Sequence, residues 1–429
     1  MAGRKKVVVT GVGAVTALAH SIESTFEKLC AGQNAIVEIP YLKEAGFPVY
    51  IGGLVPDLET LEEAYPESRE HHSRKLAYLL KSADEALGNA GLSHLGGYKA
   101  GVFLGVETSR LPLESAFRIF QLSGRESNRV DYQKFGALCQ EIVSADQVQN
   151  KQPSFLSRFL AARFGVTGPV LATSNACASS NYAMGAALRK LRSGEIDVAI
   201  TGSADEMIDP YIVMGFHLLT ALSTCNSEPS KAIKPFDVRR DGFVLGEGGA
   251  ILVLETAEHA RRRGAPVLCE LAGFGSTSDG EKITACNRQG SWLQEAMKRA
   301  IEDGGMTLED IGYINAHGTS TRLNDLAESR AITALFGDHA KNIVVNATKS
   351  MIGHAVAAAG AIEAAVTVLS LDRGVCHPTR NLEVRDKECE LNYGSDGPVQ
   401  AKLVGAISNS CGFSGGNTCV AFRKLESCE

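Results

Sequence analysis

Short apolar runs alternate with longer amphipathic stretches along most of the chain. The apolar runs are rich in Val, Ile and Ala, which is typical of strands buried on both faces. Strands that alternate with helices predict an α/β architecture. The predicted strands cover residues 6–10, 100–104, 170–172, 198–201, 250–254, 267–271, 312–315, 343–346 and 404–408, and the clearest helices cover 21–31, 74–90, 182–192 and 292–303.

The order of these elements occurs twice. Residues 79–108 and 293–321 each give a helix, a glycine-rich stop, a strand and a polar loop. A strand, a small polar turn and a helix of alanines and glycines then follow at 171–188 and again at 344–364. Only tightly packed, buried helices need so many small residues, so the pattern predicts duplicated halves. Their predicted bounds are 1–262 and 263–429; the alternative is that any two βα units look alike.

Composition excludes several classes of function. The 429 residues are 44% hydrophobic and 21% charged, which is ordinary for a globular enzyme with a large core. A net charge of −6 gives no support to nucleic-acid binding. No window approaches the roughly 18 apolar residues that a membrane span needs, and the apolar run at 7–9 is too short for a signal peptide. These features predict a cytoplasmic protein with no membrane partner.

One of the eleven cysteines has a distinctive setting. The cysteines form no C-x-x-C pair, so neither a zinc ribbon nor a redox dithiol is indicated, and most are expected to be small buried hydrophobes. Cys177 lies in SNACASSNYAMGAAL, after a predicted strand and at the start of a predicted helix that Ser174 or Asn175 is suited to cap. Amides at a helix N-terminus should lower the pKa of this thiol and stabilise an oxyanion.

Two histidines and a glycine-rich loop are the other candidates. His317 and His354 both follow predicted strands, where α/β folds place active sites. A lone histidine is more often structural, but two in matching positions favour a site that faces Cys177. The loop NSCGFSGGN, residues 409–417, surrounds Phe413 with three glycines, so its backbone can approach a ligand closely. The alternative is a simple turn between two late strands.

Six segments occur in the order found in one enzyme family. The chain resembles the 3-oxoacyl-(acyl carrier protein) synthases of the elongating Cys-His-His type, and equally the ketosynthases of type II polyketide systems. The resemblance covers essentially the whole chain. The segments that carry it are VVVTGVGAVT, the Cys177 segment, RRDGFVLGEGGAILVLE (239–255), NAHGTSTRLND, KSMIGHAVAAAGAIE and NSCGFSGGN.

The resemblance implies a fold and a set of roles. The fold would be thiolase-like, two similar halves in five layers α-β-α-β-α, usually as a homodimer. Cys177 would hold the acyl group, His317 and His354 would stabilise the enolate left by decarboxylation of malonate, and Lys349 would order the site with Glu363. The amides of Cys177 and Phe413 would form the oxyanion hole, with Phe413 also gating entry. Thr319 and Thr321 would line the pocket.

Lys349 and Glu363 are 14 residues apart, about four turns of a continuous helix. The spacing therefore predicts that the chain bends between them. No metal and no cofactor are implied, since both substrates arrive on the phosphopantetheine of an acyl carrier protein.

Several positions depart from the family pattern. The C-terminal loop normally reads NSFGFGGTN, and this chain has Cys411, Ser414 and Gly416 in place of Phe, Gly and Thr. Lys282 stands where the family usually has a histidine. We expect Ser414 to stiffen the gate and Cys411 to enlarge the pocket. A specialised acyl chain, such as an unsaturated or polyketide intermediate, is therefore the expected substrate.

Three other functions fit part of the pattern. A non-decarboxylating thiolase is suggested by Cys411-Gly412, but the KSMIGH segment argues against it. A chain-length factor, the non-catalytic partner in polyketide heterodimers, would lack the cysteine, so this chain is expected to be an active subunit, in a homodimer or paired with such a factor. A dinucleotide-binding enzyme is suggested only by Gly11-x-Gly13, and a lone G-x-G is weak.

The expected partner, acyl carrier protein, is acidic, so its docking surface should be basic. Arg74 and Lys75 match the family's docking pair, and Arg158 and Arg163 are further candidates. The alternative is a solvated helix face.

Overall fold

The computed structural model describes residues 4–108, 110–124, 129–281, 286–413 and 415–425. Its principal sheet has the strand order β10-β9-β13-β14-β8-β1-β7-β6-β4-β5. The strands of the first half are β1 (Val7–Thr16), β4 (Ala100–Gly105), β5 (Val170–Thr173), β6 (Val198–Glu206) and β7 (Glu247–Thr256). Those of the second half are β8 (Cys269–Ser278), β9 (Ile311–Asn315), β10 (Val344–Asn346), β13 (Gly405–Cys411) and β14 (Gly416–Arg423).

The two halves have the same topology. In each, the third strand in chain order lies at the outer edge, followed by the second, fourth, fifth and first. The second strand pairs in parallel with its two neighbours, while the fifth pairs antiparallel with the fourth and the first. The first strands, β1 and β8, pair only at Val8 and Val9 and join the halves. The duplicated fold is therefore confirmed, whereas the boundary at 262 stays a prediction.

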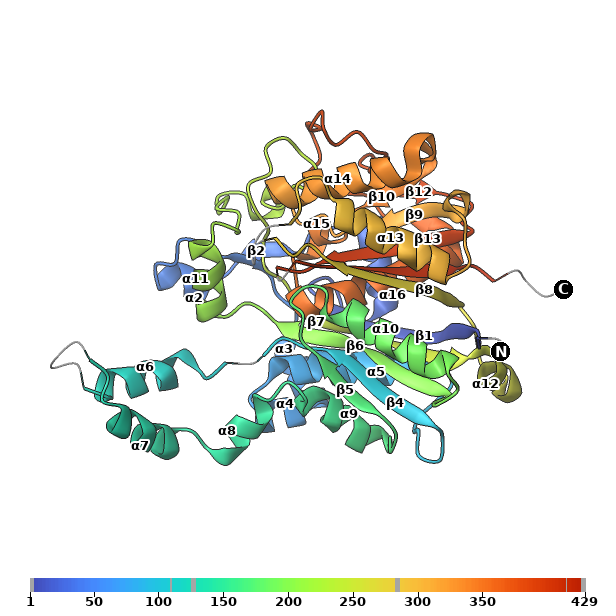
Figure 1. Ribbon diagram of the computed structural model, residues 1–429. Helices are drawn as coiled ribbons and strands as arrows, with labels where there is room; N and C mark the ends of the chain where they lie inside the picture. Colours follow the sequence, from blue (N-terminus) through green and yellow to red (C-terminus); the bar gives the residue numbers. More distant parts are fainter. Residues whose placement is uncertain (1–3, 109, 125–128, 282–285, 414, 426–429) are drawn as a thin grey trace.

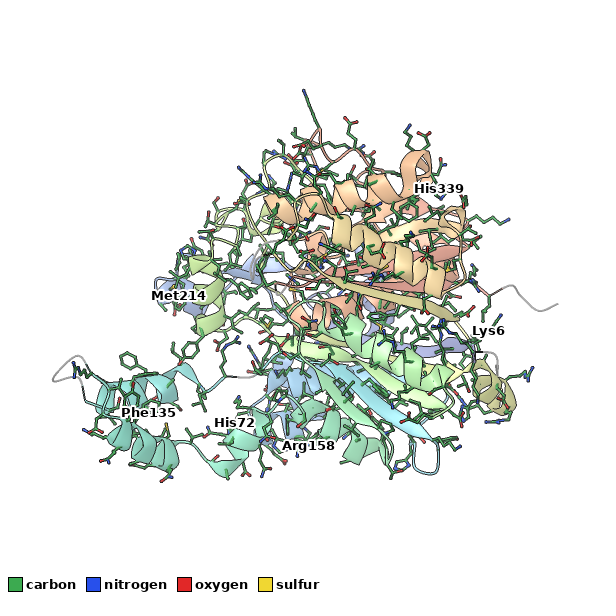
Figure 2. All side chains as sticks on the ribbon, in the orientation of Figure 1. Lys6, His72, Phe135, Arg158, Met214 and His339 are labelled. Atoms are coloured by element: carbon green, nitrogen blue, oxygen red, sulfur yellow. The ribbon has the colours of Figure 1, made fainter. Side chains whose placement is uncertain are left out.

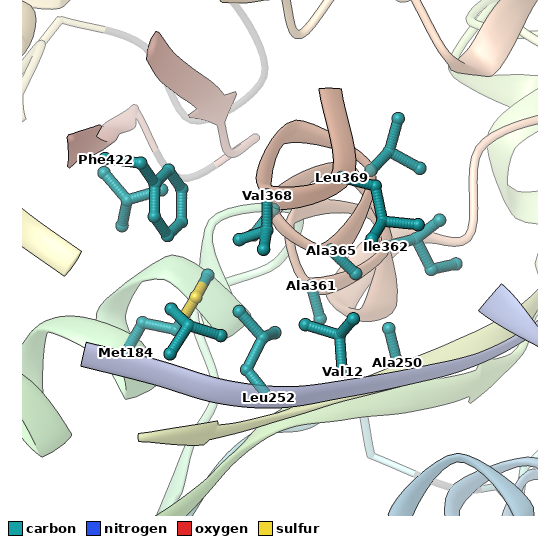
Figure 3. Packing of buried hydrophobic residues seen from close by; sticks show 14 of the residues in the cluster. Val12, Met184, Ala250, Leu252, Ala361, Ile362, Ala365, Val368, Leu369 and Phe422 are labelled. Carbon is teal, nitrogen blue, oxygen red and sulfur yellow. The ribbon is translucent and has the colours of Figure 1, made fainter. Parts of the chain in front are cut away.

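Helices form three layers around the two halves of the sheet (Figure 1). The first half is covered on its outer face by α5 (Arg74–Asn89) and α9 (Phe155–Phe164), and the second by α13 (Ser291–Asp303) and α14 (Arg322–Phe336). Between the halves lie α10 (Ser179–Arg192) and α16 (Ala359–Arg373). Figure 3 shows α16 packed on apolar side chains of β1, β7 and β14.

The small residues of α16 suit this central position. Thirteen residues of α16 are buried, and most of its first half is alanine, glycine or isoleucine. A helix packed on several sides needs short side chains for its backbone to approach its neighbours. The alanine- and glycine-rich repeat of the sequence thus marks the middle layer of the five.

The first strand is longer than the sequence predicted. Instead of ending near Gly11, β1 continues to Thr16. Gly11 and Gly13 lie against helix α5, where a Cβ would collide with the carbonyl oxygens of Ala86 and Ser82. The two glycines therefore permit close helix–strand packing rather than a turn or a nucleotide site.

Three helices project from the layered body (Figure 1). They are α6 (Leu113–Leu122), α7 (Tyr132–Ile142) and α8 (Ala145–Asn150), and we call them the arm. The sequence did not predict the arm, and α7 buries none of its described residues. Phe135, labelled in Figure 2, lies out in the arm, whereas His72 lies where the arm joins the body.

None of the described helices is long and apolar enough to cross a membrane. The remaining elements are short. These elements are α1 (Ile22–Cys30), β2 (Ile36–Glu38), α2 (Pro40–Glu44), β3 (Ile51–Gly53), α3 (Leu58–Ala64), α4 (Glu67–Glu70), α11 (Pro210–Leu218), α12 (Ala257–Arg263), α15 (Lys349–Ile352), β11 (Val375–Cys376) and β12 (Val399–Gln400), with 3₁₀ turns at Pro229–Lys231, Leu308–Asp310, Gly337–Asn342 and Val356–Ala358.

Candidate active site

The three predicted catalytic side chains meet between the two halves. Cys177 follows β5 of the first half, while His317 follows β9 and His354 follows α15 of the second. One ligand-type atom from each of the three lies within 4.8 Å of the other two. His354 Nε2 is 3.1 Å from Cys177 Sγ, and the two imidazole centroids are 5.4 Å apart. All three residues are buried.

The backbone around Cys177 is a tight loop rather than a helical turn. Ala176 has a φ of 46°, in the left-handed region that non-glycine residues rarely adopt. Ser179 Oγ holds the loop closed by accepting from Asn175 N at 2.8 Å and donating to Ala176 O at 2.6 Å. The N-cap of α10 is Ala178, so the expected cap at Ser174 or Asn175 is wrong. The strained loop projects the thiol ahead of the helix.

Burial controls the acidity of the Cys177 thiol. It raises the pKa of Cys177 to about 12, whereas Lys349 and the backbone N–H groups of Cys177 and Phe413 oppose this rise. The expectation of a lowered pKa is therefore wrong for the resting enzyme, because desolvation of the thiolate outweighs the nearby donors. The same two amides remain placed to stabilise negative charge that develops beside the sulfur.

This acidity predicts the pH dependence of alkylation. Because the pKa lies near 12, the thiolate fraction of Cys177 should rise about tenfold per pH unit between pH 7 and pH 9. The rate of iodoacetamide labelling, followed by peptide mass spectrometry, should rise in step without levelling off. A small free thiol treated in parallel should begin to level off near its ordinary pKa of about 8.5. A plateau for Cys177 below pH 9 would contradict the buried, neutral thiol.

Both histidines are neutral and present a donor to the site. Burial, reinforced by Lys349, holds the pKa of His317 and of His354 well below the usual range. Lys349 Nζ lies 3.2 Å from Nδ1 of His317, and an ammonium has only donors, so this assigns the His317 proton to Nε2. Nδ1 of His354 has no partner among the described residues. We assign its proton also to Nε2, which faces Cys177.

Lys349 and Glu363 meet across a bend, as their spacing predicted. Lys349 lies in α15 and Glu363 in α16, with a 3₁₀ turn between the two helices. Their side chains form a buried ion pair, and Lys349 Nζ also donates to the carbonyl oxygen of His317 at 2.7 Å. Burial raises the pKa of Glu363 to about 7, and the Lys349 ammonium opposes this rise. The pair thus fixes the ring and backbone of His317.

Glu328 is a positioning residue that the sequence did not single out. Its carboxylate is buried and accepts from the backbone N–H groups of His317 and Gly318, both at 2.9 Å. It also accepts from Asn409 Nδ2 at 3.1 Å, at the base of the C-terminal loop. Glu328 therefore connects the histidine loop to the loop that carries Phe413. Its place in the second turn of an otherwise ordinary helix gave no sequence signal.

An open cavity of about 280 Å³ leads to the thiol. The loop that carries Phe413 is the turn between β13 and β14, as one of the two sequence interpretations had it. It also lines the cavity, as the other interpretation had it. The Phe413 ring stacks on Phe216 at 5.6 Å, and Phe243 lies edge-on to His354 at 5.3 Å. Three phenylalanines thus form an apolar wall beside the donors of the site.

The structure describes three of the four predicted pocket residues, and these three line the cavity. Cys411, Thr319 and Thr321 line the cavity with Cys177, and the two threonine hydroxyls are 3.0 Å apart. Ser414 and Lys282 lie outside the described residues. The sequence missed the other lining residues, which are Leu219, Thr220, Ala221, Phe243, Cys286, Arg322, Leu323, Asn324 and Gly412.

The docking prediction at Lys75 is wrong. Lys75 is 4% exposed, so its ammonium cannot meet a carrier protein at the surface. Arg74 is partly exposed, and its guanidinium pairs with Glu247 at 2.7 Å. Arg163 pairs with Glu67 and Asp84, while Arg158 is exposed on α9 (Figure 2). Docking at these three arginines stays a prediction.

A duplicated α/β fold with a thiol facing two imidazoles defines the thiolase-like class of acyl-transferring enzymes. Residues 4–260 match the family model for the β-ketoacyl synthase N-terminal domain, and residues 268–383 match that for the C-terminal domain. The chain therefore belongs to the β-ketoacyl synthase family and is an acyltransferase. Both models describe synthases, so the thiolase alternative is set aside.

Relatives and solved structures agree with this family. The chain is 35% identical to 3-oxoacyl-[acyl-carrier-protein] synthase 2 of Synechocystis sp. over 426 residues, covering 99% of each chain. It is 33% identical to the enzyme of the same name from Vibrio harveyi, covering 98% of this chain and 99% of that one. A type II polyketide ketosynthase solved with its acyl carrier protein has a TM-score of 0.86 at 27% identity, covering 99% of this chain and 100% of that one.

Proposed function

We propose that the chain catalyses decarboxylative condensation of an acyl group on Cys177 with malonyl-(acyl carrier protein). The products are a 3-oxoacyl-(acyl carrier protein) and CO2. The observation that carries this proposal is the meeting of the Cys177 thiol with two imidazole donors at the foot of an open cavity. The polyketide relative is solved with a bound hexaketide, and other relatives are named 3-oxoacyl-[acyl-carrier-protein] synthases, so we propose both polyketide and other carrier-bound acyl chains as candidate substrates.

The first step transfers the acyl group to the enzyme. Cys177 Sγ attacks the carrier thioester, its bond to the acyl carbon forms, and the carrier thiolate leaves and takes the proton that the thiol gives up. Thioester exchange is nearly isoenergetic, so the acyl group can be held and released. The amides of Cys177 and Phe413, which both act on the sulfur, would donate to the tetrahedral oxyanion.

The second step forms the carbon–carbon bond. Loss of CO2 from the malonyl group leaves an enolate, whose oxygen would accept from the Nε2–H groups of His317 and His354. The enolate carbon attacks the Cys177 thioester carbonyl, the carbon–sulfur bond breaks, and the released Cys177 thiolate takes a proton from solvent. Neutral imidazoles suit this role because each donates a hydrogen bond to the enolate oxygen without transferring its proton to it.

The partners follow from the substrates. Both acyl groups arrive on the phosphopantetheine of acyl carrier protein, so the chemistry needs no separate cofactor. The ishigamide ketosynthase/chain length factor is a structural relative with a TM-score of 0.85 at 29% identity. We propose a dimer, formed with a second copy or with a chain-length-factor-like subunit, and a cytoplasmic location.

Mass spectrometry of the intact protein tests the function. Incubation with a mixture of acyl carriers should add one acyl group, and digestion should place it on Cys177. Malonyl-(acyl carrier protein) should then remove the adduct and give a 3-oxoacyl carrier with release of CO2. An adduct that malonyl carrier does not discharge, or no adduct at all, would count against the proposal.

A further inference from the structure

The three side chains of the candidate active site also form a set of metal ligands. Thiolate sulfur and imidazole nitrogen are ligands that Zn²⁺ prefers, and three protein ligands with one open position are typical of zinc enzymes. One ligand-type atom from each of Cys177, His317 and His354 lies within 4.8 Å of the other two, and we call this group the three-ligand site. All three residues line the open cavity, which has room for a water molecule as the fourth ligand. A metal ion here would occupy the sulfur of the proposed nucleophile.

The tautomer of His354 does not exclude a metal ion. A metal bonds to the lone pair of an imidazole nitrogen, so a ligating nitrogen carries no proton. Nε2 of His354 lies 3.1 Å from Cys177 Sγ, on the side where a metal would bind. Its Nδ1 is buried and has no hydrogen-bond partner among the described residues. The proton of this ring can therefore move from Nε2 to Nδ1 without facing another donor.

The tautomer of His317 is fixed in the form that cannot bind a metal at Nε2. Lys349 Nζ lies 3.2 Å from Nδ1 of His317. An ammonium has three donors and no acceptor, so this Nδ1 must accept, and the ring proton stays on Nε2. Moving that proton to Nδ1 would bring two donors face to face at the same distance. Lys349 therefore leaves Nε2 of His317 without a free lone pair.

The other contacts of Lys349 hold its ammonium in this position. It donates to the carbonyl oxygen of His317 at 2.7 Å and forms a buried ion pair with Glu363. Together with Nδ1 of His317, these contacts use all three donors of the ammonium. Both members of the ion pair are 1% exposed, and a buried charge that loses its partner is costly. The ammonium also acts electrostatically on Cys177, His317 and His354, which opposes a second positive charge among them.

We propose that Lys349 keeps Zn²⁺ and similar thiophilic divalent cations out of the three-ligand site. Without the ammonium, Zn²⁺ would bond to the Cys177 sulfur, the thiol proton would pass to solvent, and each imidazole proton would move from Nε2 to Nδ1. No oxidation or reduction is involved. This inference goes beyond the proposed function, because it concerns the protein without substrate. The proton that Lys349 holds on Nε2 of His317 is also the one proposed to meet the enolate, so one ion pair serves both purposes.

Cobalt binding tests this role of Lys349. Co²⁺ takes the same ligands as Zn²⁺, and its tetrahedral thiolate complexes absorb visible and near-ultraviolet light. In Lys349→Met, which keeps the length of the side chain without its charge, the apparent Kd for Co²⁺ should fall by roughly 10–100-fold, the size of effect typical for groups that orient metal-ligating histidines. Zn²⁺ added afterwards should displace Co²⁺ and remove the absorption. Lys349→Met/Glu363→Gln, which leaves no unpaired carboxylate, should show the same fall and replaces the single variant if that does not fold.

Two controls locate the effect. Lys81→Met removes an ammonium from helix α5 that does not line the active-site cavity, so it should bind Co²⁺ as weakly as the unaltered protein. Cys177→Ser added to Lys349→Met should remove the sulfur-to-cobalt absorption. Equal affinity, or no binding at all, in the unaltered protein and both Lys349 variants would overturn the inference, as would absorption that survives Cys177→Ser. The titrations contain no substrate, so failure of acylation or of malonyl discharge would instead overturn the proposed function alone.

Discussion

Replacing Cys177 with alanine should lower the condensation rate by roughly 10⁴-fold or more, because no other group can hold the acyl chain. Release of CO2 from malonyl-(acyl carrier protein) should persist, since the proposed donors to the enolate are His317 and His354. The two activities are measured separately, as 3-oxoacyl carrier by mass spectrometry and as labelled CO2. Their separation would show that the thiol and the imidazoles serve different steps.

Cys411→Ala is the matched control for this experiment. Cys411 is a second thiol that lines the same cavity, and burial holds its pKa well above the usual range. A synthase should keep condensation within about tenfold of the unaltered rate, whereas a thiolase that used this thiol as its base would lose activity. Condensation by Cys177→Ala, or loss in Cys411→Ala equal to that in Cys177→Ala, would contradict the assignment.

Replacing His317 with alanine should lower the rate of CO2 release by about 10²–10³-fold, which is typical for loss of one preorganised donor. Acylation of Cys177 should survive, because the ring of His317 is held by Lys349 and makes no hydrogen bond to the sulfur among the described contacts. His354→Ala should impair both steps, since His354 Nε2 lies 3.1 Å from the sulfur. Single-turnover acylation and CO2 release distinguish the two variants.

His339→Ala provides the matched control. This histidine is in the second half, away from the cavity (Figure 2), and its Nε2 lies 3.0 Å from the carbonyl oxygen of Ile311. It should leave both rates unchanged. Equal loss of acylation in His317→Ala and His354→Ala would contradict the division of roles, and unaltered CO2 release in both would contradict the enolate site.

The sequence predicted most of the layered fold because its signals are local. The small-residue repeats correspond to the buried central helices, and the alternation of strands and helices was observed in the predicted order. Local signals failed where packing between elements decides the outcome. Gly11 and Gly13 suggested the end of a strand and a weak dinucleotide-binding motif, but they admit α5 against β1. The arm was missed although α6 is as amphipathic as α5 and α13. That its helices project from the body depends on packing, which no local pattern gives.

The predictions of the acidity of Cys177 and of the position of Lys75 were wrong for a related reason. Both predictions took the nearest sequence neighbours as the environment, a helix start for the thiol and a helix face for the ammonium. Burial depends on what other segments cover a residue, and those segments come from distant parts of the chain. Desolvation then reversed the direction of the Cys177 pKa shift and removed Lys75 from the surface.

The sequence by itself determined the duplicated α/β fold, the family and the residues that carry the proposed chemistry. These follow from residue types and spacings, which a chain keeps whatever its environment. Only the tertiary structure decided that Glu328 positions His317 and that Cys177, His317 and His354 lie within reach of one another. Each of these depends on distances of a few ångströms between segments far apart in sequence, and no local pattern encodes them.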